Sequence, residues 1–228
     1  MTPRLTDRYT QALAYAAKIH ADQTRKGDAG IPYISHLLAA SSLVIEAGAD
    51  EDEAIAALLH DAAEDQGGEA RLVDIEERFG PRVAGIVREC SDSLTEDPKA
   101  KAAWRTRKTL HLMHLRDASP SAVLVSAADK LHNARCLVTD LTLDGLSYLT
   151  NFNASGADIV WYYREMYTTL TARAAPLRLT SALGECVEEF EHLINSHESR
   201  RQARKDLHDP KQVAPPTHVA PRADKRGK

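Results

Sequence analysis

Four ionisable residues lie close together in the sequence, directly after an apolar run. The segment spans residues 58–65, LLHDAAED, and contains His60, Asp61, Glu64 and Asp65. Residues four apart share a face of a helix, so His60 would lie beside Glu64 and Asp61 beside Asp65. Such groups are costly to place against a core unless a partner satisfies them, and a divalent cation would do so. The alternative interpretation is an exposed, solvated helix end, because short motifs often occur without a function.

Two more ligand-type side chains interrupt apolar segments elsewhere. His36 lies at the start of one apolar helical segment, and Asp129 ends another. Either residue alone also fits a buried polar group with a hydrogen-bond partner, or a helix cap. Together with His60 and Asp61 they form a set of two imidazoles and two carboxylates drawn from three helices. This set, which has no thiolate, suits Mn, Fe, Zn or a similar divalent metal with coordination positions left for water and substrate.

Basic residues lie near these candidates in the sequence. Arg25 and Lys26 precede a loop that contains two glycines, and Lys130 and Arg135 follow Asp129. Arginine and lysine suit phosphate oxygens, the first as a bidentate fork and the second as a point charge. Ordinary surface charge is the alternative for these positions, so the residues alone indicate a phosphate site without establishing it.

Two other groups have weaker interpretations. Arg105, Arg107 and Lys108 most simply form a solvated helix face, although their charge would also suit phosphates. His111 and His114 have the spacing of a metal-binding pair, but no further ligand lies near them in the sequence. Neither group is therefore assigned to the predicted site.

The elements that must position these residues are predicted to be helices throughout. Apolar residues recur at spacings of three and four, with no sustained alternation between turn signals, which predicts an all-α domain. Thr2 is the predicted cap of the first helix, and Asp50 with Glu53 has the pattern of a capping box. The expected helices span about 2–20, 34–47, 50–66, 72–79, 82–90, 99–116, 120–133, 153–174 and 176–196.

Charge divides the 228-residue chain into two parts. Residues 199–228 hold nine Lys/Arg and three Asp, a net charge of +6, against −10 for residues 1–198. We expect 1–198 to be one folded domain and the proline-containing 199–228 to be a disordered tail, because the latter has too little apolar surface to offset its ordering entropy. The acidic body disfavours nucleic-acid binding, since affinity for the phosphate backbone comes from clustered Lys and Arg.

Cellular location is predicted from what the chain lacks. No apolar run approaches the ~20 residues of a membrane span, and the N-terminus has no apolar stretch typical of a secretory signal. Three cysteines without a CxxC pair indicate neither a disulfide framework nor a cysteine zinc site. We therefore expect a cytoplasmic protein that binds no membrane and that has an oligomeric state the sequence leaves open.

Three segments together resemble the hydrolase motifs of the RelA/SpoT proteins, within the HD-domain phosphohydrolase superfamily. The segments are residues 25–36 (RKGDAGIPYISH), 58–65 (LLHDAAED) and 128–133 (ADKLHN). The chain is most similar to the single-domain branch, the small alarmone hydrolases related to the metazoan SpoT homologue, over about residues 5–170. The resemblance implies an HD-domain helical bundle. We do not expect synthesis of the alarmone, because the chain is too short to hold the synthetase domain of the bifunctional proteins as well.

The resemblance also implies an activity and a set of roles. It implies one divalent metal ion, usually Mn²⁺, and hydrolysis of the 3′-pyrophosphate of guanosine tetra- and pentaphosphate to GDP or GTP and pyrophosphate. By motif position the metal ligands would be His36, His60, Asp61 and Asp129. The catalytic carboxylates would be Glu64 and Asp65, with Glu64 the better placed to handle a proton. The contacts to the nucleotide would come from Arg25, Lys26 and Asn133.

The chain departs from the family pattern at three places, which leaves other substrates open. Leu37 stands where many relatives have proline, and the loop 27–31 is two residues longer than in the large bifunctional enzymes. Cys136 replaces a threonine common beside the nucleotide, so recognition of the base is less defined than catalysis. The same site could act on NADPH 2′-phosphate, an adenosine alarmone or a deoxynucleotide. A non-catalytic nucleotide-sensing module is a further alternative, against which the intact Glu64 and Asp65 argue.

Overall fold

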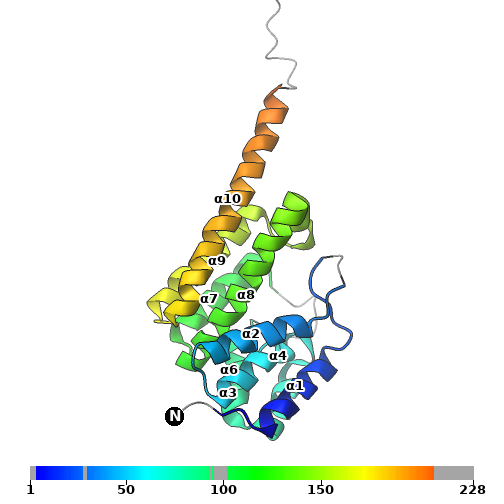
Figure 1. Ribbon diagram of the computed structural model, residues 1–228, viewed down its shortest axis with the longest axis vertical. Coiled ribbons are helices and arrows are strands. Elements are labelled where there is room, and N and C mark those ends of the chain that lie inside the picture. The colour runs from blue at the N-terminus through cyan, green and yellow to red at the C-terminus, as the bar shows by residue number, and fades with distance from the viewer. Residues whose placement is uncertain (1–3, 28–29, 93, 95–101, 208–228) are drawn as a thin grey trace, which may run out of the picture.

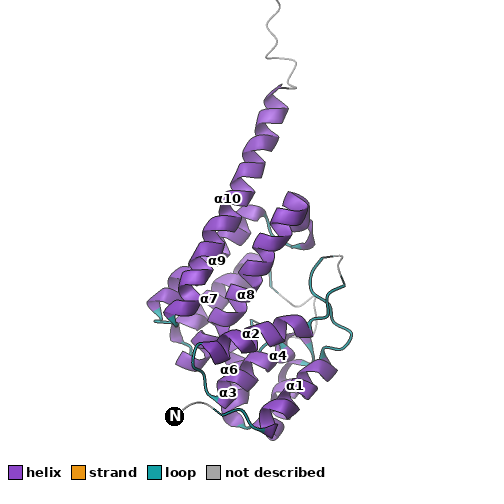
Figure 2. Ribbon diagram, viewed as in Figure 1, coloured by secondary structure: helices purple, strands orange, loops and turns teal. Residues whose placement is uncertain are grey.

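Helices are the regular elements of the computed structural model, which describes residues 4–27, 30–92, 94 and 102–207 (Figures 1 and 2). The described elements are α1 (Asp7–Ile19), α2 (Ile34–Glu46), α3 (Glu51–Leu59), α4 (Ala62–Asp65), α5 (Gly68–Phe79), α6 (Pro81–Cys90), α7 (Trp104–Asp117), α8 (Pro120–Asp144), the 3₁₀ helix η1 (Gly145–Asn151), α9 (Gly156–Ala172) and α10 (Leu177–Leu207). The prediction of an all-α fold is confirmed.

Helix α8 joins the two halves of the bundle. It packs against α2, α3 and α6 on one side and against α9, α10 and η1 on the other. In Figure 1, α1 to α6 gather at one end of the molecule, while α8, α9 and α10 run side by side and α10 projects beyond them. A residue in the middle of α8 can therefore meet side chains from both halves.

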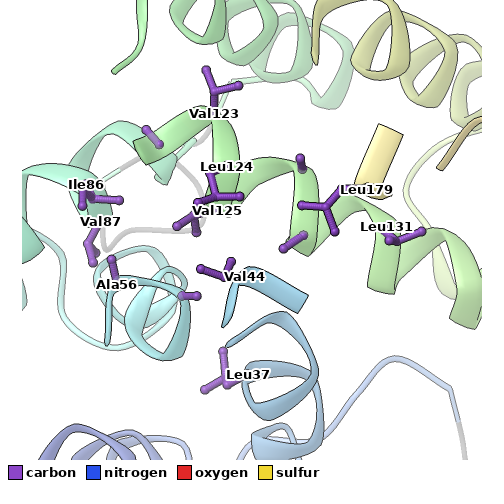
Figure 3. Packing of buried hydrophobic residues seen from close by; sticks show 14 of the residues in the cluster. Leu37, Val44, Ala56, Ile86, Val87, Val123, Leu124, Val125, Leu131 and Leu179 are labelled. Atoms are coloured by element: carbon purple, nitrogen blue, oxygen red, sulfur yellow. The ribbon is translucent and has the colours of Figure 1, made fainter. Parts of the chain in front are cut away.

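Helix α3 is buried on every side, which fixes the position of the residues that follow it. Each residue from 54 to 59 is fully buried. The helix packs against α1, α2, α6 and α8. Figure 3 shows Ala56 of α3 in one cluster with Val44 of α2, Val87 of α6 and Val125 of α8. Close packing of this kind leaves α3 little freedom to move. His60, which directly follows α3, is therefore held in a fixed position.

The capping box predicted at the start of α3 is present. The Glu53 backbone N–H donates to Asp50 Oδ1 over 3.1 Å, and the Asp50 backbone N–H donates to Glu53 Oε2 over 2.9 Å. We expect Asp50→Ala to lower the free energy of unfolding by about 1 kcal/mol, because it leaves a helix-end N–H without its acceptor. Urea denaturation measures the change.

Asp50→Asn is the matched control for this prediction. Asparagine also caps helices well, while it loses the exposed ion pair with Arg82, which contributes little. A similar loss of stability in both variants would show that the ion pair, and not the cap, stabilises this end of α3.

Several predicted helix boundaries were wrong, among them the end of the helix predicted at 120–133, which continues to Asp144. Helix α1 begins at Asp7 with Thr6 as its cap, because the Thr6 hydroxyl accepts the Arg8 N–H and its backbone is extended; the predicted cap, Thr2, lies outside the described residues. The predicted helix 50–66 is divided, since the chain turns at residues 60–61 between α3 and α4. Helix α5 starts at Gly68 and not at residue 72.

The C-terminal boundaries differ as well. Helix α10 continues to Leu207, so it enters the segment predicted to be a disordered tail. The rest of that predicted tail, 208–228, lies outside the described residues. The 3₁₀ helix η1 was not predicted. Across the described parts of the chain, no helix is both long and apolar enough to cross a membrane.

Candidate metal centre

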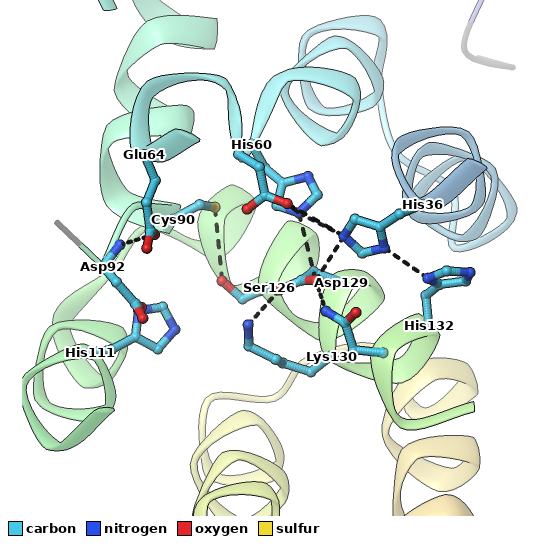
Figure 4. Close-up of polar contacts among 12 residues, drawn as sticks. His36, His60, Glu64, Cys90, Asp92, His111, Ser126, Asp129, Lys130 and His132 are labelled. Carbon is cyan, nitrogen blue, oxygen red and sulfur yellow. Dashed lines mark hydrogen bonds and ion pairs between the residues drawn. The ribbon is translucent and has the colours of Figure 1, made fainter. Parts of the chain in front are cut away.

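Three of the four predicted metal ligands meet at one buried point between α2, the end of α3 and α8 (Figure 4). His36 Nε2 lies 3.3 Å from His60 Nε2 and 3.2 Å from Asp129 Oδ1. The distance from His60 Nε2 to Asp129 Oδ1 is 3.6 Å. All three side chains are buried, so donors that are far apart in the sequence face one another away from bulk water.

The fourth predicted ligand, Asp61, joins the same group. Its Oδ2 lies 3.1 Å from His60 Nε2 and 3.5 Å from His36 Nε2. The structure thus gathers two imidazole nitrogens and two carboxylates with no thiolate among them. This donor set fits a divalent ion of the manganese, iron or zinc type.

The two carboxyl groups at this point are in the form that binds a cation. Burial alone would raise the pKa of Asp129, but Lys130 and the two histidines hold it well below its ordinary value. The pKa of Asp61 is likewise held well below its ordinary value, because His60 and His36 outweigh the effect of burial. Both carboxyl groups are therefore ionised at neutral pH, which is the form that binds a metal.

Hydrogen bonds behind the ligands orient them. His60 Nδ1 lies 2.8 Å from the Ala57 carbonyl oxygen; because a carbonyl only accepts, Nδ1 carries the proton and Nε2 is left to face the site. The Tyr33 hydroxyl donates to Asp61 Oδ2 over 2.6 Å. His36 Nδ1 contacts His132 Nδ1 at 2.7 Å.

Sequence reasoning missed the roles of Tyr33 and His132. Both belong to the motif segments, yet neither was assigned a function. A signal existed in their spacing, since Tyr33 lies three residues before His36 and His132 three residues after Asp129. Residues three apart can share one side of a helix turn, so both could have been expected near the ligand set. The spacing does not predict their actual partners, which are Asp61 for Tyr33 and His36 for His132.

The two predicted catalytic carboxylates follow the metal ligands in α4. Glu64 is half-buried, and its Oε2 accepts the Asp92 backbone N–H over 3.0 Å. Burial and the negative charge of Asp92 raise the pKa of Glu64 to about 7. Asp65 is exposed and accepts a hydrogen bond from Gln23 Nε2 over 2.8 Å. Glu64 is therefore the carboxyl group that can both bind and release a proton near neutral pH.

The predicted nucleotide contacts lie on the other side of Asp129. Asn133 Nδ2 donates to Asp129 Oδ1, and Asn133 Oδ1 accepts from Arg25 Nη2 over 2.8 Å. Lys26 Nζ lies over the Phe152 ring, 4.6 Å from its centroid. Lys130 donates to Asp129 Oδ2 over 2.5 Å, so it is a partner of a ligand and not a surface charge.

A cavity of about 750 Å³ opens beside His132. Its wall on α8 includes residues one turn apart, namely His132, Cys136, Asp140 and Asp144, together with Arg135 and Thr139. Arg25 and Lys26 line the cavity from the loop before α2, and Tyr148 lines it from η1. The volume lies within the range of small-ligand sites. Arg25 in its lining is connected to Asp129 through Asn133.

Two groups considered in the sequence do not add ligands to this centre. His111 Nδ1 faces Asp92 Oδ1 at 2.6 Å and does not form a metal pair with His114. Arg107 and Lys108, interpreted as a solvated face, both face Asp92. That interpretation was wrong for Lys108, whose side chain is largely buried.

The helical bundle and its histidine and carboxylate donors define a phosphohydrolase class built around a divalent metal. Residues 12–144 match the family model of the HD domain. The chain belongs to the HD-domain family, in its RelA/SpoT-type, single-domain branch.

Similar proteins support this assignment. The chain is 37% identical to the guanosine-3′,5′-bis(diphosphate) 3′-pyrophosphohydrolase MESH1 of Drosophila melanogaster, over 57% of this chain and 69% of that protein. It is 38% identical to MESH1 of Homo sapiens, over 56% and 68%. A solved structure described as a metazoan orthologue of SpoT that hydrolyses ppGpp superposes with a TM-score of 0.66 at 30% identity, covering 81% of this chain and 96% of that one.

Proposed function

We propose that this protein hydrolyses the 3′-pyrophosphate of guanosine tetra- and pentaphosphate, giving GDP or GTP and pyrophosphate. The observation that carries the proposal is the convergence of His36, His60, Asp61 and Asp129 at one point. His132, which contacts His36, lines a cavity that Arg25 and Lys26 also line. The relatives named for this activity share the fold.

The four converging side chains would hold one divalent ion, which we propose is Mn²⁺. When bound, such an ion supplies Lewis acidity toward phosphoryl oxygens and makes water more acidic. Glu64 accepts and returns a proton at its carboxylate, because its pKa is near 7. Asp65, exposed at the end of α4, orients water or substrate beside it.

The remaining site residues bind the nucleotide. Arg25 and Lys26 neutralise phosphate oxygens, the first as a fork and the second as a point charge. Asn133 holds the Arg25 guanidinium beside Asp129. The cavity along α8 receives the nucleoside, with Cys136 in its wall.

The direct test is hydrolysis by the purified protein. Incubation with Mn²⁺ and ppGpp should release equal amounts of pyrophosphate and GDP. A parallel set with NADPH, an adenosine alarmone and deoxynucleotides measures selectivity. If the metal is bound and ppGpp is not hydrolysed, the proposal is wrong, and turnover of another member of the set would identify the substrate instead.

We expect Tyr33→Phe to weaken metal binding by about 10- to 100-fold, because it removes the hydroxyl that holds Asp61 in place. A competition titration with a chromogenic chelator measures the affinity. Tyr9→Phe is the matched control, since it removes the contact of a hydroxyl with Ser41 away from the metal ligands. Equal affinity in Tyr33→Phe and the unmodified protein would contradict a role for Tyr33.

We also propose a cytoplasmic location and a limited role for the C-terminus. Cys90, Cys136 and Cys186 are free thiols in the described structure, which suits a reducing compartment.

The donors and the cavity lie within residues 25–151. We therefore propose that the basic tail after α10 has no catalytic part.

A further inference from the structure

A buried network of ionisable side chains lies beside Glu64 and contains none of the proposed metal ligands. Figure 4 shows two of its members, Asp92 and His111. Asp92, in the connection after α6, lies between Lys108 and His111 of α7. The side chains of Asp92 and His111 are 5% and 4% exposed, and that of Lys108 is 17% exposed. Burying charged groups in this number is rarely justified by stability alone, because apolar residues would pack as well or better.

Asp92 connects this network to Glu64 through its own backbone. Its Oδ1 faces His111 Nδ1 at 2.6 Å and its Oδ2 pairs with Lys108 Nζ. Its backbone N–H donates to Glu64 Oε2 over 3.0 Å. Since the side chain is held on both oxygens, the N–H that faces Glu64 is held as well.

The partners of Asp92 are fixed in turn. Lys108 Nζ lies 5.1 Å from the centroid of the Tyr162 ring on α9. Arg107 Nη1 lies 3.9 Å from Asp92 Oδ2. His111 Nε2 is buried and has no hydrogen-bond partner among the described residues. Within the described structure, the polar contact of this ring is therefore the one between Nδ1 and Asp92.

We propose that Asp92, held by Lys108 and His111, is a positioning residue that orients the Glu64 carboxylate and sets its affinity for a proton. The inference rests on the proposed function, in which Glu64 moves the proton. None of the three residues touches the metal ligands in the described structure, so they would act through Glu64.

The charges that face Glu64 make opposite predictions for two substitutions. Burial and the negative charges of Asp92 and Asp61 raise the pKa of Glu64, while the hydrogen bond from the Asp92 backbone N–H and the positive charge of Lys108 lower it. Asp92→Asn keeps the backbone N–H and removes only the charge. Asp92→Asn should therefore lower the pKa of Glu64, and Lys108→Met should raise it. A purely structural role would not shift the pKa in opposite directions.

The experiment is the pH dependence of kcat for ppGpp hydrolysis. The limb of this pH profile that is absent in Glu64→Gln is assigned to the titration of Glu64. We expect Asp92→Asn to move that limb down by about 0.5 to 1 pH unit and Lys108→Met to move it up by a similar amount. Arg105→Met is the matched control, because it removes a positive charge from the same helix but from a residue paired with Asp158.

Two results would overturn the proposal: a limb that stays in place in both variants, or one that moves in the same direction in both. Metal content and circular dichroism of each variant show that it is folded and loaded. If Asp92→Asn does not fold, Lys108→Met alone decides by the direction of its shift.

A second readout separates this inference from the proposed function. The ¹³C chemical shift of the Glu64 carboxyl group, in protein loaded with diamagnetic Mg²⁺, reports its titration without any turnover. If ppGpp is not hydrolysed, the proposed function is wrong, while opposite shifts of the Glu64 titration in the two variants would still support the network. Unchanged titration in active variants would reject the network alone.

Discussion

Replacing Asp129 with asparagine should reduce ppGpp hydrolysis by more than about 100-fold and remove most of the bound metal. Loss of a residue that only orients a ligand costs 10- to 100-fold in metal affinity or activity, so loss of a ligand should cost more. The asparagine would keep the size of the side chain but not the ionised oxygen that lies 3.2 Å from His36 Nε2. Elemental analysis of the purified variant and an assay at saturating Mn²⁺ measure the two effects.

Asp117→Asn is the control for this experiment. Asp117 is an exposed residue at the end of α7, so its loss removes the same charge from the chain without touching the centre. Full metal content in Asp129→Asn would contradict the assignment of Asp129 as a ligand. Full activity without bound metal would contradict the metal-dependent reaction itself.

The second large effect is expected at Glu64. Glu64→Gln should lower kcat by about 10²- to 10⁴-fold, the contribution typical of a positioned acid or base. Glutamine keeps the acceptor oxygen for the Asp92 N–H but cannot take up a proton. Because Glu64 is not among the converging donors, the metal content should stay at the level of the unmodified protein.

We expect Glu64→Gln to lose activity and keep its metal, whereas Asp129→Asn should lose both. Glu69→Gln on the surface of α5 is the control, since Glu69 is exposed and pairs only with Arg88 in the described contacts. If kcat of Glu64→Gln is near that of the unmodified protein, another group must handle the proton. Asp65 would be the first residue to test.

The sequence predicted the elements whose signals are local. The span of α2 and the capping box at Asp50 depend on apolar spacing and on side chains three residues apart, so both could be derived from the sequence. The all-α class followed from the same spacing. The resemblance named His36, His60 and Asp129 as metal ligands, and the structure brings these three side chains into one cluster.

Other features depend on tertiary contacts that no local pattern encodes. The turn between α3 and α4 places His60 and Asp61 at a helix end, although the apolar spacing runs on without a break. The burial of Lys108 depends on Asp92, which belongs to another element of the chain. The sequence of residues 99–116 indicates only a charged helix. It could not predict that Lys108 pairs with Asp92.

The donors of the metal centre come from α2, from the end of α3 and from α8, which are far apart along the chain. An unfolded chain cannot bring them together, so metal binding and folding are thermodynamically linked. Free metal at 100 times its dissociation constant would add about 2.7 kcal/mol to the free energy of unfolding. Removing the metal with a chelator would therefore both stop the proposed reaction and lower the free energy of unfolding.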